Sequence, residues 1–232
     1  MGDAVIFDVD GTLINSVDLH ARAWQAALER FGKHVPYLKV RQQIGQGGGR
    51  LLPLFLSPGE LDRFGQELQA WRDRHYQDDF LPRARPFPYV RELFARLKSD
   101  GLRVAVATSG KRAEVDVSLE RADVTALVDV VVTGDDLDAT KPNPEAFELA
   151  LAKLGGRDGG RVVVVGDSPY DAQAARRAGL EAIGVLSGGF TAAELRAAGC
   201  SLLFEDCADL LHRYSSWQKA RPQQAGEEFV IR

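Results

Sequence analysis

Apolar runs alternate with amphipathic stretches along the part of the chain that follows residue 88. The apolar runs are rich in β-branched residues: RVAVATS (103–109), VDVVVTG (128–134), RVVVVGD (161–167) and LEAIGVL (180–186). Stretches with helical spacing lie at about 88–100, 111–122, 144–154, 170–178 and 191–198. Strands that are apolar throughout and alternate with helices are typical of a parallel sheet covered by helices on both faces. The pattern therefore predicts an α/β fold.

One further strand of this kind, AVIFDVD (4–10), stands apart from its partners, which arrive only after residue 100. The segment between them has apolar residues at helical spacing, beginning with Leu19, Ala23, Trp24, Ala27, Leu28 and Phe31. The proline-rich stretch LPRARPFP (81–88) is where helices should end and the chain should return to the sheet. The predicted domains are an α/β core at 1–15 and 83–215, an inserted helical cap at 16–82 and, after a final helix near 206–215, a frayed tail at 216–232.

Composition narrows the class of protein. The chain has 232 residues, a net charge of −4 and 45% hydrophobic residues, which suits globular domains with a full core. It has no basic leader and no run of about 18 apolar residues, so we expect a cytoplasmic location and no membrane partner. Scattered Lys and Arg form no basic stripe, which excludes nucleic acid as a partner. The spacing of Cys200 and Cys207 matches no CxxC pair, so small buried or half-buried side chains in a reducing compartment are expected. Nothing in the sequence indicates the oligomeric state.

Acidic residues follow the predicted strands at the ends where an open parallel sheet binds its ligands. Asp8 and Asp10 follow the first strand, and Asp167 and Asp171 follow the run at 161–167. Four carboxylates cannot all stay ionised together without a cation. A cluster with only oxygen ligands suits a hard divalent ion, Mg²⁺ in particular, which completes its shell with water and phosphate oxygens.

The remaining polar residues at these strand ends suit a phosphate group. The Thr108 hydroxyl, the backbone N–H groups around Ser109 and Gly110, and the Lys141 ammonium can all bind phosphate oxygens. In the cap, the glycine-rich stretch IGQGGGRLL (44–52) predicts a bend between two helices. Arg50 in this stretch either binds a second anionic group of a substrate or points into solvent.

Four motifs in order carry a resemblance to a known family. DVDGTL (8–13), ATSG (107–110), TKPNPEAF (140–147) and VGDSPYDA (165–172) are similar to the motifs of the haloacid dehalogenase superfamily. The resemblance is to the subgroup whose helical cap is inserted just after the first motif, which includes phosphoglycolate phosphatases and β-phosphoglucomutases. It covers about 4–16 and 86–205, and it implies a Rossmann-like core with the cap over its site.

The resemblance also implies a role for each motif residue. Asp8 would be the nucleophile and form an aspartyl-phosphate. Asp10 would protonate the leaving group and then activate the hydrolytic water. Mg²⁺ would be held by Asp8, by the backbone carbonyl of Asp10 and by Asp167, with Asp171 as a further ligand through water or as a support. Lys141 would steady both the nucleophile and the phosphoryl charge, and Thr108 would act with it on the phosphate.

We therefore expect a Mg²⁺-dependent phosphatase that hydrolyses a small-molecule phosphomonoester and is similar to phosphoglycolate phosphatases. A β-phosphoglucomutase-like isomerase and a non-catalytic phosphate-binding or phospho-acceptor module are the alternatives. A dehalogenase fits less well, because that chemistry needs neither Asp10 nor a metal. One fold and one core chemistry serve many phosphate esters, so the sequence does not name the substrate.

Structural interpretations exist for several of these residues. Asp8 and Asp10 could close a turn, Asp167 and Asp171 could cap a helix, Thr108 could cap the next one, and Lys141 could be a solvated loop lysine. Three further groups are expected to lie outside the site. The acidic loop residues Asp135, Asp136 and Asp138 suit a solvated face. The histidines are not spaced along the chain as metal ligands are, so they suit the surface or the packing of the cap: His20, His34, His75 and His212. Trp24, Phe31 and Trp71 suit the core of the cap.

Overall fold

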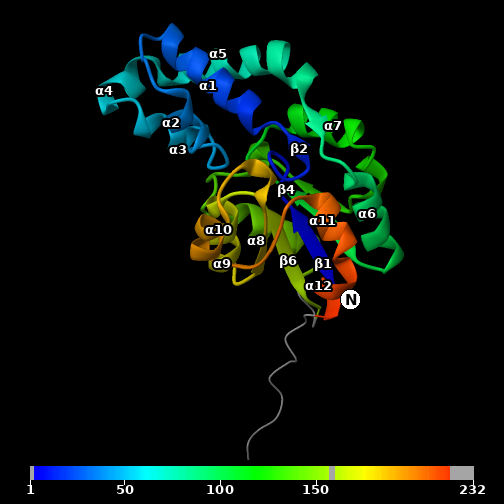
Figure 1. The fold of residues 1–232 in the computed structure, drawn as a ribbon. Coiled ribbons are helices and arrows are strands. Elements are labelled where there is room, and N and C mark those ends of the chain that lie inside the picture. The colour runs from blue at the N-terminus through cyan, green and yellow to red at the C-terminus, as the bar shows by residue number, and fades with distance from the viewer. Residues whose placement is uncertain (1–2, 157–159, 220–232) are drawn as a thin grey trace, which may run out of the picture.

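The computed structural model of the chain describes residues 3–156 and 160–219 (Figure 1). At its centre is a six-stranded sheet with the order β5-β4-β1-β6-β7-β8, in which every neighbouring pair is parallel. The strands are β1 (Ala4–Phe7), β4 (Arg103–Ala107), β5 (Val130–Val132), β6 (Val162–Gly166), β7 (Glu181–Val185) and β8 (Cys200–Phe204). The predicted parallel α/β sheet is therefore confirmed.

The central strand β1 is buried on both faces, as its apolar sequence predicts. Val5 and Phe7 belong to one hydrophobic cluster, whereas Ala4 and Ile6 belong to another. This split follows from the strand geometry, since successive side chains point to opposite faces. β1 lies between β4 and β6, so its carboxyl end is at the middle of the sheet edge.

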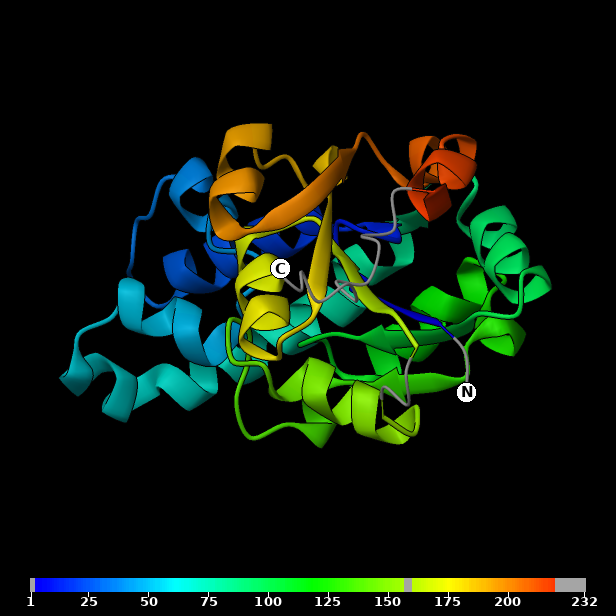
Figure 2. The same cartoon turned by 90° about the horizontal axis from the view of Figure 1, so that it is seen from below.

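Helices cover both faces of the sheet (Figure 2). One face packs against α6 (Val90–Ser99), α7 (Arg112–Arg121), α11 (Cys207–His212) and α12 (Tyr214–Lys219). The other face packs against α8 (Glu145–Lys153), α9 (Pro169–Arg177) and α10 (Ala192–Ala198). The five helices expected after residue 88 all form, within a few residues of their predicted bounds.

Two features near the C-terminal end differ from the expectation. The strand β8 was not predicted, because its sequence CSLLF is short and only half-buried at the edge of the sheet. The tail predicted from residue 216 is helical up to Lys219. Trp217 explains this, because it is buried and packs against the Tyr214 ring, with ring centroids 5.3 Å apart. Residues 220–232 of the predicted tail lie outside the described residues.

The helices between residues 17 and 83 pack around a hydrophobic cluster of their own and lie beyond the carboxyl end of β1 (Figure 1). They are α1 (Val17–Arg30), α2 (Tyr37–Arg41), α3 (Gly48–Leu51), α4 (Pro58–Glu60) and α5 (Gln66–His75), with the short π and 3-10 turns η1 (Leu52–Leu54), η2 (Leu61–Gly65), η3 (Tyr76–Phe80) and η4 (Leu81–Arg83). We call this segment the cap. Its cluster contains Trp24, with Phe31 and Trp71 packed against it, as predicted.

The chain enters and leaves the cap through a pair of short strands. β2 (Ile14–Asn15) is antiparallel to β3 (Arg85–Pro86), and β3 lies in the proline-rich stretch expected to return the chain to the sheet. The glycine-rich stretch forms the predicted bend between α2 and α3. Gly47 has φ +79° there, and a Cβ on it would lie 2.7 Å from the Thr140 side chain, so the bend packs against the core beside Lys141. Among the described residues, none of the helices has the length and apolar character of a membrane span.

Candidate active site

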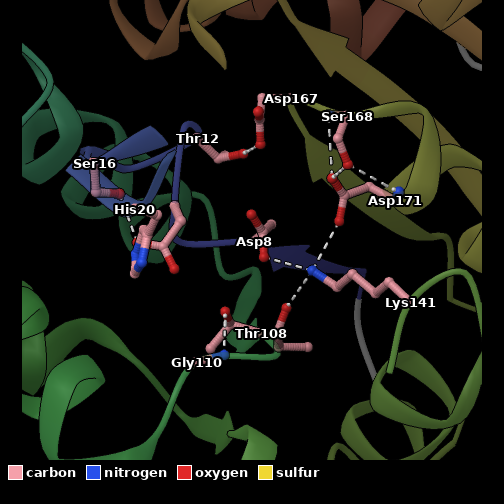
Figure 3. Close-up of polar contacts among 12 residues, drawn as sticks. Asp8, Thr12, Ser16, His20, Thr108, Gly110, Lys141, Asp167, Ser168 and Asp171 are labelled. Carbon is pink, nitrogen blue, oxygen red and sulfur yellow. Dashed lines mark hydrogen bonds and ion pairs between the residues drawn. The ribbon is translucent and has the colours of Figure 1, made fainter. Parts of the chain in front are cut away.

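Asp8 is buried directly after β1, where Lys141 reaches it from the segment between β5 and α8 (Figure 3). The Lys141 ammonium donates to Asp8 Oδ1 and, at 3.1 Å, to the carbonyl oxygen of Ala107, and it pairs with Asp171 Oδ1 at 2.7 Å. Burial raises the pKa of Asp8 to about 7, although the Lys141 charge opposes this rise. Lys141 is 1% exposed and thus not the solvated loop lysine of the structural interpretation.

Asp167 and Asp171 complete a cluster of buried carboxylates with Asp8. Oxygen atoms of the three side chains lie within 4.8 Å of one another. Burial raises the pKa of Asp167 well above its usual value, and the neighbouring Asp171 and Asp8 charges add to the rise. Thr12 Oγ1 donates to Asp167 Oδ1 at 3.2 Å. Three negative charges in this buried cluster would repel one another strongly. A bound cation would relieve this repulsion.

The helix α9 positions Asp171. Ser168 is the N-cap, and its side chain and that of Asp171 form a capping box at the first turn. Asp171 Oδ2 accepts from the Ser168 backbone N–H at 3.1 Å and from its hydroxyl at 2.5 Å, which leaves Oδ1 facing Lys141. Asp171 therefore both caps the helix and faces the cluster, whereas Asp167 is not the cap residue.

Asp10 turns away from this cluster toward the start of the cap. Ser16 Oγ donates to Asp10 Oδ1 at 2.5 Å, and His20 Nε2 lies 2.9 Å from the same oxygen. Burial by itself raises the pKa of Asp10, but contact with His20, the Ser16 hydrogen bond and the Arg72 charge lower it to about 2. Asp10 is thus a carboxylate held at the junction of sheet and cap.

The end of β4 supplies small polar groups that face Asp8 and Asp10. Thr108 is buried, and its Oγ1 accepts the backbone N–H of Gly110 at 3.1 Å, so it stabilises this loop rather than capping α7, whose N-cap is Lys111. Ser109 Oγ is buried without a hydrogen-bond partner. Thr108, Ser109 and Gly110 all line the same cavity as Asp8 and Asp10. Its lining brings together the first two of the four predicted motifs.

This cavity, which we call the catalytic cavity, has a volume of about 110 Å³ and lies between the sheet edge and the cap. The glycine-rich bend contributes Gly47, Gly48 and Leu51 to its wall. Arg50 is exposed and does not line it. The reason is helical spacing, since α3 places Gly48 and Leu51 on the cavity side and Arg50 on another face. The structure therefore does not support Arg50 as a substrate-binding residue, and the solvent-facing interpretation holds.

A chain of polar contacts crosses from the core to the cap and back. Its members are Lys111 at the start of α7, Asp73 and Arg72 on α5, His20 on α1, and Asp10. Lys111 Nζ lies 2.6 Å from Asp73 Oδ2, and Arg72 Nη1 donates to Asp73 Oδ1 at 3.2 Å. Arg72 Nη2 contacts His20 Nδ1, whose ring leads on to Asp10. We call this series the cap chain.

Sequence reasoning missed every cap member of the cap chain. His20 packs in the cap, which is one of its two expected places, since it is buried and its ring stacks on Tyr76, but its contact with Asp10 was not expected. The sequence does contain a sign of this contact, because His20 comes four residues after Ser16. This spacing puts both side chains on one side of the helix start, toward Asp10. No such signal exists for Arg72 and Asp73, because α5 lies far along the chain.

The acidic loop residues Asp135, Asp136 and Asp138 do not line the catalytic cavity, as expected. Within this loop, Asp136 accepts a hydrogen bond from the Thr133 hydroxyl at 3.0 Å.

Comparisons with known proteins agree with this geometry. A profile of the family described as haloacid dehalogenase-like hydrolase matches residues 5–185. A phosphoglycolate phosphatase from Neisseria meningitidis serogroup A is 33% identical over 192 residues, which cover 80% of each chain. Protein SUPPRESSOR OF QUENCHING 1 from Arabidopsis thaliana is 32% identical over 213 residues; these are 89% of this chain, which spans 20% of that protein's length. The solved structure of a hydrolase from Pseudomonas syringae aligns with a TM-score of 0.80 and 29% identity, over 92% of this chain and 98% of the other. The chain belongs to the haloacid dehalogenase-like hydrolase family.

Proposed function

We propose that this haloacid dehalogenase-like phosphatase hydrolyses a small phosphomonoester through an aspartyl-phosphate on Asp8, with Mg²⁺ as its cofactor. The supporting observation is the position of Asp8. Its buried carboxylate lines the catalytic cavity, is held by Lys141 and lies within one cluster with Asp167 and Asp171. A carboxylate in this position can attack phosphorus and split one difficult displacement into two.

The donor set fits Mg²⁺. Three buried carboxylates cluster here, Lys141 pairs with two of them, Asp8 and Asp171, and burial raises the pKa of both Asp8 and Asp167. Asp8, Asp167 and the backbone carbonyl of Asp10 would hold the ion, with Asp171 as a further ligand or support. When bound, Mg²⁺ supplies positive charge between the attacking carboxylate and the phosphate oxygens.

The chain's own residues account for the remaining steps. Lys141, the Thr108 hydroxyl and the backbone N–H group of Ser109 bind the phosphate oxygens and orient the phosphorus toward Asp8. The Gly110 N–H group joins them once it leaves Thr108 Oγ1, to which it donates in this structure. Asp10 gives a proton to the departing oxygen and then takes one from the water that cleaves the aspartyl-phosphate. The lowered pKa of Asp10 favours its ionised form, which is the form that the second step needs. A phosphate dianion beside it raises its proton affinity for the first step.

Cys200 and Cys207 are both free thiols, as the sequence predicted. Cys207 is buried and Cys200 is half-buried, and burial raises the pKa of each thiol to about 12. Free, unreactive thiols are compatible with the cytoplasmic location that we propose.

The experiment is a screen of the purified protein against a panel of phosphate esters, with and without Mg²⁺, with phosphate release as the readout.

Asp8→Asn should lower kcat for p-nitrophenyl phosphate by about 10³-fold or more. Asp10→Asn should accumulate a covalent phosphate adduct, visible by mass spectrometry of rapidly quenched protein, because the second step lacks its base. An Asp8→Asn variant that keeps more than about a tenth of the wild-type kcat would contradict the proposal. Interconversion of sugar phosphates without phosphate release would identify a mutase instead.

A further inference from the structure

The side of the catalytic cavity that faces the cap holds two cations and two carboxyl groups among its described residues. The cations are Arg72 and Lys111, and the carboxyl groups are those of Asp73 and Glu114. The alcohol part of a substrate must occupy this side, because Asp8 and the phosphate-binding loop after β4 occupy the other. The partners of these four side chains therefore indicate which alcohols the cavity accepts.

Both cations are paired with Asp73. Lys111 Nζ lies 2.6 Å from Asp73 Oδ2, and Arg72 Nη1 donates to Asp73 Oδ1 at 3.2 Å. The guanidinium carbon of Arg72 also lies 4.9 Å from the ring centroids of both Trp24 and Tyr76, so the group is packed in place. Arg72 and Asp73 are each 7% exposed. To pair with Arg72, a carboxylate or second phosphate on the substrate would have to displace Asp73 from a buried pair, which is costly, whereas the Lys111 side chain is 46% exposed.

His20 is held within the cap chain on both sides of its ring. Its Nδ1 contacts Arg72 Nη2, and its Nε2 lies 2.9 Å from Asp10 Oδ1. Among the described residues of this wall, the charges of Arg72 and Lys111 are both balanced by Asp73, although the Nε donor of Arg72 is buried without a hydrogen-bond partner.

A second, larger hollow continues from this wall. Its volume is about 470 Å³, and it shares Gln69, Asp73 and Lys111 with the catalytic cavity. We call it the outer hollow. The rest of its lining is Gln66, Ala70, Arg74 and Gln77. Three glutamine amides thus line it, and amides both donate and accept hydrogen bonds, as hydroxyl groups do. Arg74 is exposed to solvent, where an ion pair contributes little.

We propose that the alcohol released by this enzyme is neutral and rich in hydroxyl groups, such as a polyol or a sugar, and that Asp73 excludes alcohols with a second anionic group. The proposal rests on the proposed phosphatase function and names its substrate class. The catalytic cavity takes the phosphate and the adjoining carbon atoms. The remaining hydroxyl groups extend along α5 into the outer hollow, where Gln66, Gln69 and Gln77 bind them.

The test uses pairs of esters that differ only by a carboxylate. The first pair is 2-hydroxyethyl phosphate and 2-phosphoglycolate, and the second is sorbitol 6-phosphate and 6-phosphogluconate. In each pair we expect the neutral member to have the higher kcat/KM by about tenfold or more, because the anionic member meets a wall whose cations are already paired. We also expect the longer neutral ester to exceed the shorter one, since only it reaches the outer hollow.

Asp73→Asn tests the excluding residue directly. It removes the negative charge and frees Lys111 and Arg72, so the preference for the neutral member should narrow by about tenfold. Asp78→Asn is the matched control, because Asp78 is an exposed carboxylate in η3 that lines neither the catalytic cavity nor the outer hollow. It should leave the ratio unchanged. The comparison within the wild-type protein requires no variant to fold.

Equal or reversed preference in both pairs for the wild-type protein would overturn the proposal. So would cleavage of p-nitrophenyl phosphate with no cleavage of any of the four esters, in which case the phosphatase function itself would stand. An absence of activity toward p-nitrophenyl phosphate as well would contradict the phosphatase function and the proposal together.

Discussion

His20, on the first helix of the cap, donates its Nε2 proton to Oδ1 of Asp10 at 2.9 Å. Arg72 contacts the other ring nitrogen, and the His20 ring stacks on Tyr76 with centroids 3.9 Å apart. A side chain with two hydrogen-bond partners and a stacked ring has little freedom. The cap therefore fixes the orientation of the carboxylate that we propose as acid and base.

His20→Ala should lower kcat by about 10- to 100-fold, because Asp10 loses one of its two side-chain partners and can leave its productive position. Binding of Mg²⁺ should change little, since His20 does not contact Asp8, Asp167 or Asp171. Steady-state kinetics and Mg²⁺ titration by calorimetry measure the two effects. His20→Gln, which keeps an N–H donor, should recover part of kcat. A loss of Mg²⁺ affinity as large as the loss of kcat would contradict a positioning role.

Lys141→Met should destabilise the fold by about 3–5 kcal/mol, because it leaves the buried carboxylates of Asp8 and Asp171 without their cation. Urea unfolding measures this change in the free energy of unfolding. The double variant Asp8→Asn with Lys141→Met should be less destabilised than Lys141→Met alone, since one of the unpaired charges is removed. Lys98→Met is the control, because its pair with Asp129, at 2.7 Å, is partly exposed and should contribute at most about 1 kcal/mol. Equal effects at the two lysines would argue against a buried ion pair.

Stabilisation by Mg²⁺ should increase as the pH rises from about 5 to about 8. Burial raises the pKa of Asp8 from 3.8 to about 7, so the metal-free fold is most stable when Asp8 is protonated and loses stability as pH rises through this window. Asp10, with a pKa near 2, stays ionised across it. Mg²⁺ binds the ionised carboxylates, so the gain in Tm on adding Mg²⁺ should grow from about pH 5 to pH 8.

Asp8→Asn is the control for this pH dependence, because it removes one of the two carboxyl groups whose pKa burial raises and should weaken the trend, with Asp167 carrying the remainder. Activity should also disappear in EDTA, return with Mg²⁺ and return poorly with Ca²⁺, which prefers a larger and looser shell. A Tm gain that is the same at every pH would show that the cation does not bind at Asp8.

The sheet and the core half of the site could be predicted because strand ends determine them. An apolar run such as RVVVVGD places its last residue, Asp167, at the carboxyl edge of a parallel sheet whatever the rest of the chain does. The same reasoning placed Asp8 and Thr108 at that edge. The strand β8 was not predicted, because its partly polar sequence lies at the sheet edge, where fewer of its side chains need to be buried.

The cap half of the site could not be predicted, because it depends on how the cap sits on the core. Asp73 meets Lys111 only because the cap brings this part of α5 to the start of α7, and no spacing in the sequence encodes that contact. Arg50 was a candidate for anion binding by residue type alone, yet the turn of α3 directs it away from the cavity. Charge and residue type identify candidates, but the packing of two helices decides which of them reach the substrate.

Gly188 packs directly against the carboxylate of Asp167. It lies in η7 (Leu186–Gly188), after β7, and a Cβ on Gly188 would lie 1.7 Å from Asp167 Oδ2. The segment is fixed from two sides, since Ser187 Oγ donates to the Gly11 carbonyl at 2.6 Å and Arg41 Nη2 donates to the Gly188 carbonyl at 3.1 Å. The segment can therefore not move aside without breaking these contacts, so a Cβ on Gly188 would have to displace the Asp167 carboxylate.

Gly188→Ala should displace the Asp167 carboxylate and lower Mg²⁺ affinity by about 10- to 100-fold, the size of effect seen when residues that orient metal ligands are changed. Calorimetric titration with Mg²⁺ measures this without any substrate. Gly59→Ala is the matched control, because a Cβ on Gly59 meets nothing within 4 Å, so the same substitution there should leave Mg²⁺ affinity unchanged. Since Gly188 lies far from Lys111 and Asp73 in sequence and lines neither the catalytic cavity nor the outer hollow, the relative preference among phosphate esters at saturating Mg²⁺ should also persist. If Gly188→Ala folds normally and binds Mg²⁺ as tightly as the wild-type protein, Asp167 does not hold the metal and the assignment of the cluster is wrong.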